Sequence, residues 1–489
     1  MRWGRRSGTV LFGLLLLPLV VSSICWLSTG WLPQGDEGWI ALRIHDVFSA
    51  HPPLQGMRST SGITNSGVWA HHPGPIEFYL LAVPYAATGF HPAGLVLGCL
   101  LLAAGMVATA LWHGRLAGGR TGVAMVVIAV AGCELLLGPF LVLPWNPWPA
   151  VLGFIALMVV SWRILLGHRA ALPCFVAVGS VVVQANLALI PMVLPLFIVM
   201  CAVGMLRWRR ERGTVWPLPG WRPRGRPPIW RRPGVLAIVL TLALWLPALV
   251  ELFVVTPNNA SQVWALALDT LGSPLRLVAT VVLVAGCCWC AWPIDSTVRI
   301  SPRSALRWVS GLVGLGLALS VAASGATRVL YLVMALGAII LAGVAWCDTW
   351  VRSLPAQRVP PVAWAALGLL VALLIGPAGP MHNRFVGGET SDSKLARQPV
   401  EEAVRQLRAA GVHGGAVVVH CDAGRALVSF CPAVVARLAA DGYAPYFDTY
   451  WPKREDDAYR RIDRAPADAV AVTIRDDHSP LVTMPSGRG

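Results

Sequence analysis

The amino-acid sequence predicts a polytopic α-helical membrane protein with about eleven transmembrane helices, two outer-face juxtamembrane helices in the first loop, and a small C-terminal α/β domain. Of its 489 residues, 56% are hydrophobic and 13% are charged, whereas soluble domains carry about 25% charged residues. Apolar stretches of about 18–20 residues, the length needed to cross a bilayer, recur along the chain. The acidic residues concentrate in the tail, where residues 379–489 hold 14 of the 24.

The first predicted span covers residues 9–27 and follows Arg2, Arg5 and Arg6. The small residues that a signal-peptide cleavage site requires are out of place here, so we expect this span to be retained. The other predicted spans cover residues 93–112, 121–143, 148–166, 171–187, 188–206, 235–252, 275–294, 308–323, 328–347 and 361–378.

The distribution of arginine predicts the orientation. With the N-terminus in the cytoplasm, 21 arginines fall on the cytoplasmic side, and the short outer loops hold only Arg43, Arg58, Arg276 and Arg328. A twelfth span at residues 74–89 would place the nine-arginine segment 207–232 outside, against the positive-inside rule. Residues 74–89 are therefore predicted to form an interfacial or shallowly re-entrant helix, begun by Pro73 and Pro75.

This topology gives a membrane domain over residues 1–380, with a first outer loop at 28–92, and an extracytoplasmic domain over 381–489. Loops as long as the first one are usually functional. In the tail, the patterns predict helices at residues 399–410 and 430–441 and strands at 416–420 and 469–474. Cys421 and Cys431 are the only cysteines there, and a disulfide between them is permitted outside the cytoplasm.

Asp36 and Glu37 open a helical pattern at the start of the first outer loop. One interpretation is structural: Asp36 caps the helix, and Glu37 stabilises its first turn. The other is chemical, because a carboxylate at the mouth of a membrane cavity can act as a general base towards a hydroxyl. The two interpretations are compatible, since capping also fixes a side chain in place.

The acidic pair, the amphipathic helix after it and the segment "HPGPIEFYLL" together resemble the GT-C superfamily of membrane glycosyltransferases. The most similar group comprises the protein mannosyltransferases and aminoarabinose transferases, in their actinobacterial form. The segments "LPWNPWPA", "VVVQANLALIP" and "LWLPALVELFVVTPNNAS" extend the resemblance over roughly residues 10–380.

The resemblance implies a sugar donor linked to polyprenyl phosphate and an extracytoplasmic acceptor, which is a cell-envelope glycan, a lipid or a protein. It places the catalytic base at Asp36, with Glu37 as the alternative, and implies inversion at the anomeric carbon. The departing phosphate needs positive charge or hydrogen-bond donors. The outer candidates are Arg58, His71, His72 and Arg328. No cofactor is predicted with certainty, and a divalent metal ion is left open.

Other polar positions are candidates for substrate contacts: Arg43, Glu77, Glu134, Trp145, Asn146 and Glu251. Glu134 lies within an apolar span, and carboxylates there are costly and usually face a cavity. Trp145 and Asn146 also fit an aromatic belt at the interface, and Glu251 also fits a simple position at the end of its span.

Two other classes of function remain. One is a non-catalytic protein that binds or assembles lipid-linked glycans; the other is a transporter, whose usual internal repeats are not evident. The scattered arginines build no continuous nucleic-acid-binding face, and segment 207–232 is expected to contact anionic lipids. Only Lys394 and Lys453 among the 39 basic residues are lysines. This preference for arginine over lysine indicates a GC-rich bacterial genome and thus a bacterial plasma membrane.

Overall fold

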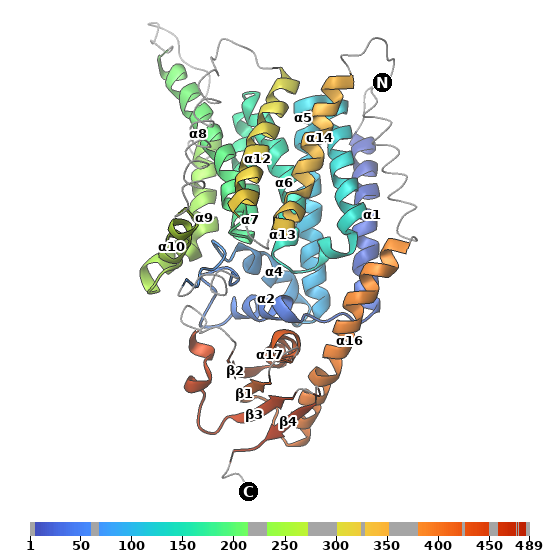
Figure 1. The fold of residues 1–489 in the computed structure, drawn as a ribbon, viewed down its shortest axis with the longest axis vertical. Helices are drawn as coiled ribbons and strands as arrows, with labels where there is room; N and C mark the ends of the chain where they lie inside the picture. The colour runs from blue at the N-terminus through green and yellow to red at the C-terminus, as the bar shows by residue number, and fades with distance from the viewer. Residues whose placement is uncertain are drawn as a thin grey trace.

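The computed structural model describes residues 5–59, 68–213, 232–271, 301–323, 328–351, 380–422, 426–448, 458–475, 477 and 479–485. A bundle of apolar helices occupies one part of the molecule, and a small sheet with its helices occupies the other (Figure 1). The predicted spans at residues 275–294 and 361–378 lie outside the described residues.

The helices of the bundle follow most of the predicted spans. They are α1 (Arg5–Ser28), α5 (Pro92–Leu137), α6 (Pro147–Leu165), α7 (Leu172–Ala185), α8 (Leu189–Gly213), α9 (Pro233–Val254), α12 (Pro302–Ala323), α13 (Arg328–Met334) and α14 (Leu336–Val351). Within the described part, four stretches are long and apolar enough to cross a membrane: Ser7–Ser28, Pro92–Val142, Pro147–Leu165 and Pro233–Val254. The chain is therefore an integral membrane protein, whereas the number of eleven spans stays a prediction.

Helix α5 contains two of the predicted spans. Its 46 residues are interrupted at Gly119, whose φ of 60° is readily adopted only by glycine. The two halves then pack closely, because a Cβ on Gly122 would lie 2.2 Å from the carbonyl oxygen of Gly114. Glycine at this crossing lets the two backbones approach without a side chain between them.

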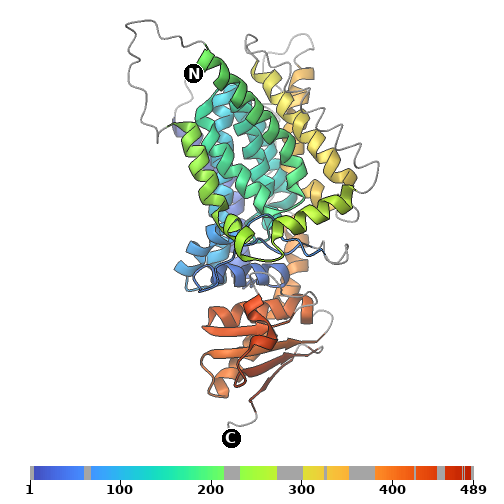
Figure 2. The same cartoon turned by 90° about the vertical axis from the view of Figure 1, so that its left-hand side faces the viewer.

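Two short helices lie across one end of the bundle (Figure 2), α2 (Gly35–Asp46) and α4 (Ile76–Ala87). A 12-residue helix such as α4 is about 18 Å long, which is too short for a hydrocarbon core of about 30 Å. This agrees with the prediction that residues 74–89 do not cross. The helix cap was predicted wrongly: α2 begins at Gly35 after Gln34, so Asp36 lies in the first turn instead.

The C-terminal part comprises α16 (Pro380–Ala409), β1 (Gly415–Cys421), α17 (Cys431–Ala440), β2 (Tyr443–Phe447), β3 (Val470–Ile474) and β4 (Pro480–Thr483). The sheet order is β2-β1-β3-β4, with β1 parallel to both β2 and β3 and with β4 antiparallel to β3. The predicted strands 416–420 and 469–474 match β1 and β3, and the predicted helix 430–441 matches α17. Strands β2 and β4 escaped prediction because they are short and each contains a proline, which strands usually avoid.

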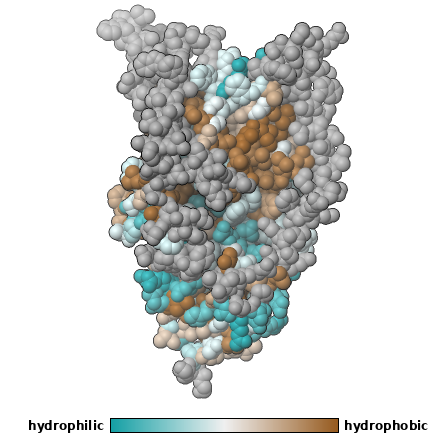
Figure 3. Space-filling view, viewed as in Figure 1, coloured by the Kyte–Doolittle hydropathy of each residue, from teal (hydrophilic) through white to brown (hydrophobic). Residues whose placement is uncertain are grey.

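The two parts differ in surface and in core. Hydrophobic residues gather over the bundle, and hydrophilic residues cover much of the sheet domain (Figure 3). Inside that domain, β3 buries every second side chain, Val470, Val472 and Ile474, as expected for a strand with one face in the core. Val435 and Leu438 of α17 are fully buried in the same core.

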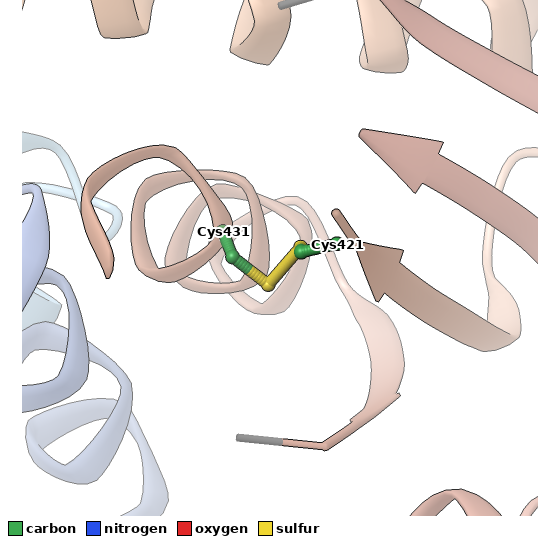
Figure 4. Close-up of a disulfide and its surroundings, with 2 residues drawn as sticks. All are labelled: Cys421 and Cys431. Atoms are coloured by element: carbon green, nitrogen blue, oxygen red, sulfur yellow. A yellow bond between two sulfur atoms is a disulfide. The ribbon is translucent and has the colours of Figure 1, made fainter. Parts of the chain in front are cut away.

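A disulfide joins Cys421 at the end of β1 to Cys431 at the start of α17, with the Cα atoms 6.1 Å apart (Figure 4). The sequence singled out this pair, and the structure confirms it. The bridge closes a loop with a sequence separation of 10 residues.

Replacing both cysteines with serine is expected to lower the free energy of unfolding of this domain by about 3 kcal/mol, because the unfolded chain regains the entropy of an open loop. Thermal unfolding of the full-length protein would measure the loss. Cys201→Ser, at an exposed free cysteine in the bundle, is the matched control. Equal unfolding temperatures for the double variant and the control would contradict the expectation.

Candidate functional site

Asp36 meets a residue that lies far away in the sequence. The indole Nε1 of Trp145, just before α6, donates a hydrogen bond of 3.1 Å to Asp36 Oδ2. The Asp36 side chain is exposed to solvent, yet the surrounding protein desolvates it and raises its pKa, with the Trp145 hydrogen bond opposing the rise. The two properties are compatible, because water can reach one side of a carboxylate while protein atoms cover its other sides.

Aromatic rings extend from Trp145 into the bundle. The Trp145 ring meets that of Trp148 edge-on at 5.0 Å, and Trp148 stacks on Phe140 at 5.5 Å. Trp148 also lines a small apolar recess of about 10 Å³, room for about one water molecule. The other lining residues are Cys99, Leu102, Ala103, Met106, Leu141, Leu143, Pro149 and Leu152. The rings of Trp145 and Trp148 thus connect the exposed Asp36 carboxylate to the small apolar recess.

Glu37 lies in the first turn of α2 and is half-buried. A further carboxyl group with a raised pKa lies on α4. Glu77 is only 6% exposed, and burial raises its pKa to about 8. Its Oε1 has no hydrogen-bond partner among the residues that the structure describes. At neutral pH Glu77 is therefore mostly a neutral acid that can donate a hydrogen bond.

Glu251 was predicted to contact substrate, but its hydrogen bonds hold the first outer loop in place. Its Oε1 accepts hydrogen bonds from Gln55 Nε2 and from the backbone N–H of Asn259, both at 2.7 Å. The Asn259 side chain in turn accepts from the backbone N–H of His71 at 2.8 Å. The buried Glu251 carboxylate therefore ties the outer loop to the end of α9 and the start of α10 (Asn259–Leu271).

Glu251→Leu is expected to destabilise the protein by about 1–3 kcal/mol for each buried donor that loses its acceptor. Glu251→Gln keeps one acceptor oxygen and is the matched control. The difference in unfolding temperature between these two variants in detergent measures the effect. A Leu variant as stable as the Gln variant would mean that these hydrogen bonds do not support the loop.

His72 differs from the expectation for a phosphate-binding residue. Burial lowers its pKa to about 3, and its Nδ1 accepts a 3.2 Å hydrogen bond from the backbone N–H of Leu187. A neutral, buried ring supplies no positive charge at neutral pH. Asn146 also supports the framework, since its Nδ2 donates to the carbonyl oxygen of Ala185 at 2.8 Å.

Among the other residues predicted to contact the donor phosphate, Arg58 and His71 lie next to each other. The backbones of Arg58 and His71 pair across the first outer loop in an isolated antiparallel bridge. Arg58 is half-buried and His71 is buried. Arg328 begins α13, and its side chain lies outside what the structure describes.

Arg43 was predicted to contact substrate, yet it is buried and donates to Asp46 Oδ2 at 3.3 Å. Asp46 is fully buried and also binds Arg460 and Tyr459 of the C-terminal domain. Burial alone would raise the pKa of Asp46, but the His45 ring, with Nδ1 3.7 Å from Asp46 Oδ1, and the charges of Arg460 and Arg43 outweigh it and hold the pKa well below its usual range. This cluster was not predicted from the sequence.

One local signal pointed to Asp46. A carboxylate in the last turn of a helix opposes the helix dipole, so a partner with positive charge is expected. Its partner Arg460 is 414 positions away, and no local pattern identifies it.

Glu134 lies buried in the second half of α5, and neither carboxyl oxygen has a hydrogen-bond partner among the described residues. No hydrogen bond seen in the described part of the chain links it to Asp36 or Trp145. The same residues contain no group of three or more His, Cys, Asp or Glu side chains arranged to hold a metal ion.

Comparison with known proteins gives one similar structure. No family model matches the chain, and no curated protein matches it. The chain is similar to the crystal structure of ArnT from Cupriavidus metallidurans bound to undecaprenyl phosphate, with 16% identity and a TM-score of 0.43. The similarity covers 88% of this chain and 75% of that one. Residue roles in the present chain therefore rest on its own geometry.

Proposed function

We propose that this membrane protein transfers a sugar from a polyprenyl-phosphate-linked donor to an extracytoplasmic acceptor, with Asp36 as the general base. One observation supports the proposal: a solvent-accessible carboxylate with a raised pKa accepts a hydrogen bond from Trp145, at the end of a row of aromatic rings. The combination suits a reaction in which a lipid-linked donor meets a water-soluble hydroxyl. The acceptor is a cell-envelope glycan, a lipid or a protein.

The proposed chemistry needs one proton acceptor. Trp145 occupies Oδ2 of Asp36, so Oδ1 is the oxygen proposed to take the proton of the acceptor hydroxyl. The hydroxyl oxygen attacks the anomeric carbon, and the bond from that carbon to the phosphate oxygen breaks, with inversion. The phosphate leaves with the electron pair. A raised pKa makes Asp36 a stronger base than an ordinary aspartate, and Glu37 is the alternative.

Neighbouring groups have roles in the same proposal. The apolar side chains around the small recess are proposed to contact part of the prenyl chain at their surface, since ligand sites pair apolar walls with a few polar groups. Glu77, as a neutral acid, is proposed to donate a hydrogen bond to the donor. Arg58 is the proposed source of positive charge for the departing phosphate, and Arg328 is a second candidate.

The proposal also includes the membrane that holds the protein and the orientation of the protein in it. The chain lies in a bacterial plasma membrane, with the N-terminus in the cytoplasm and the domain of residues 381–489 on the outer side. The loop with Asp36 then faces the outer leaflet, where a lipid-linked donor and an envelope acceptor meet.

The test is a reconstituted assay with a radiolabelled polyprenyl-phosphate sugar and an envelope extract as acceptor source. Protein-dependent transfer of label, with release of polyprenyl phosphate, supports the proposal. Binding of the donor without any release would favour the second candidate, a non-catalytic protein that holds lipid-linked glycans. Neither binding nor release would reject both.

A further inference from the structure

Helix α2, which carries Asp36, is packed between the bundle and the C-terminal domain (Figure 1). Its middle fits tightly against α17, because a Cβ on Gly38 would lie 2.7 Å from the carbonyl carbon of Pro432. One residue further, the Trp39 ring stacks on that of Phe447 at 4.7 Å. The C-terminal domain therefore covers one full side of this helix.

The start of α2 meets the same domain. Ser429 Oγ, which precedes α17, donates a 2.9 Å hydrogen bond to the side-chain oxygen of Gln34, two residues before Asp36. The disulfide between Cys421 and Cys431 closes the segment that contains Ser429. The segment at the head of the helix is thus itself restrained.

The far end of α2 is held by charge. Arg460 Nη2 contacts Asp46 Oδ1 at 2.5 Å, and Tyr459 Oη donates to Asp46 Oδ2 at 2.5 Å. Arg460 Nη1 also donates to the carbonyl oxygen of Pro445 at 3.1 Å, which ties the ion pair to β2. Asp46 is fully buried and Arg460 is 7% exposed. Water does not screen this pair, so moving the helix end away from Arg460 would strand a buried charge.

We propose that Arg460 and Tyr459 are positioning residues: through Asp46 they fix the axis of α2 and thereby the place of the Asp36 carboxylate beside Trp145. Ten residues of helix separate Asp46 from Asp36, a lever of about 15 Å. A tilt of about 4° at one end moves the other by about 1 Å, and an error of that size can cost about 10²-fold in rate. The inference rests on the proposed function for its effect on rate, but not for its effect on the helix.

The central experiment replaces Arg460 with Met in the full-length protein. We expect kcat for sugar transfer to fall about 10²-fold, while KM for the donor changes less than about threefold, because Glu77 and Arg58, proposed to contact the donor, lie outside α2. Arg460→Lys keeps the charge and should recover part of kcat. Arg461→Met is the matched control, since Arg461 is an exposed neighbour whose guanidinium pairs with Asp463.

A second variant and a second measurement test the inference even if Arg460→Met does not fold. Tyr459→Phe removes two hydrogen bonds, to Asp46 and from Arg460, without leaving a charge unpaired, so it should fold even where Arg460→Met does not, with kcat lowered about threefold to tenfold. Hydrogen–deuterium exchange of the backbone amides of residues 35–46 is independent of activity. Faster exchange there in Arg460→Met and Tyr459→Phe, but not in Arg461→Met, supports the inference.

The outcomes separate the two proposals. If the wild-type protein transfers sugar and both variants match it in kcat and in exchange, the positioning role is wrong and the proposed function stands. If the wild-type protein transfers no sugar, the proposed function fails, and the exchange of residues 35–46 alone decides whether Arg460 and Tyr459 hold the helix. A loss of donor binding equal to the loss of kcat would also overturn the inference.

Discussion

Asp36→Asn is expected to lower the rate of sugar transfer by about 10²–10⁴-fold, the usual contribution of a positioned general base. Asparagine keeps the size of the side chain and an oxygen that can accept the Trp145 hydrogen bond, so the variant should fold and still bind a polyprenyl-phosphate sugar. Single-turnover transfer and donor binding, measured on the same preparation, separate the two effects.

The matched control is Glu37→Gln, one residue along the same helix, for which we expect a milder loss. The wild-type rate should also depend on pH in a defined direction. Because the pKa of Asp36 is raised, the basic form is lost at a higher pH than for an ordinary aspartate as the solution is acidified. The acidic limb of the pH–rate profile should vanish in Asp36→Asn. Near-normal turnover of that variant would leave Asp36 with only a structural role in the first turn.

A reporter that is active only outside the cytoplasm should be silent when fused near Gly220 and active when fused after Gly489. The expected contrast is all-or-none, because 21 arginines lie on one predicted side and four on the other. The ends of α8 and α9 that flank segment 214–231 lie at the opposite end of the bundle from the C-terminal domain (Figure 1). The two fusion points are therefore expected on opposite sides of the membrane.

A third fusion at Gly167, between α6 and α7, is the internal control and should also be silent. The reverse pattern, active at Gly220 and silent after Gly489, would mean that residues 74–89 cross the membrane. It would also move Asp36 and Trp145 to different sides, which their 3.1 Å hydrogen bond forbids. In that case the first outer loop would have to be arranged differently from the structure.

Hydrophobic length and charge made the membrane helices predictable. Helices α1 and α9 follow predicted spans closely, because each is a long apolar run that must satisfy its backbone hydrogen bonds within the membrane. The two prolines before α4 and its short apolar run likewise predicted a short helix that does not cross, and α4 has 12 residues. Strands β1 and β3 and helix α17 were found from local patterns. Helix α10 was missed, since its pattern is amphipathic and lies between two spans.

Part of the candidate site also followed from the sequence alone. Asp36, Glu37 and Trp145 were singled out by position and chemistry, and Asp36 and Trp145 meet in the structure. Glu77 was a candidate for its charge, but no local pattern predicts that burial raises its pKa. A pKa depends on all atoms around a group, and these come from distant parts of the chain.

By itself the sequence determined which segments form long apolar helices and where soluble character begins, because both depend on properties summed over neighbouring residues. Only the tertiary structure decided which polar residues are framework: Glu251 binds Gln55, His72 accepts from Leu187, and Asp46 binds Arg460. Each pair joins residues more than 100 positions apart. A buried polar group must find a partner wherever the fold brings one within hydrogen-bond distance, and that distance is set by packing rather than by local sequence.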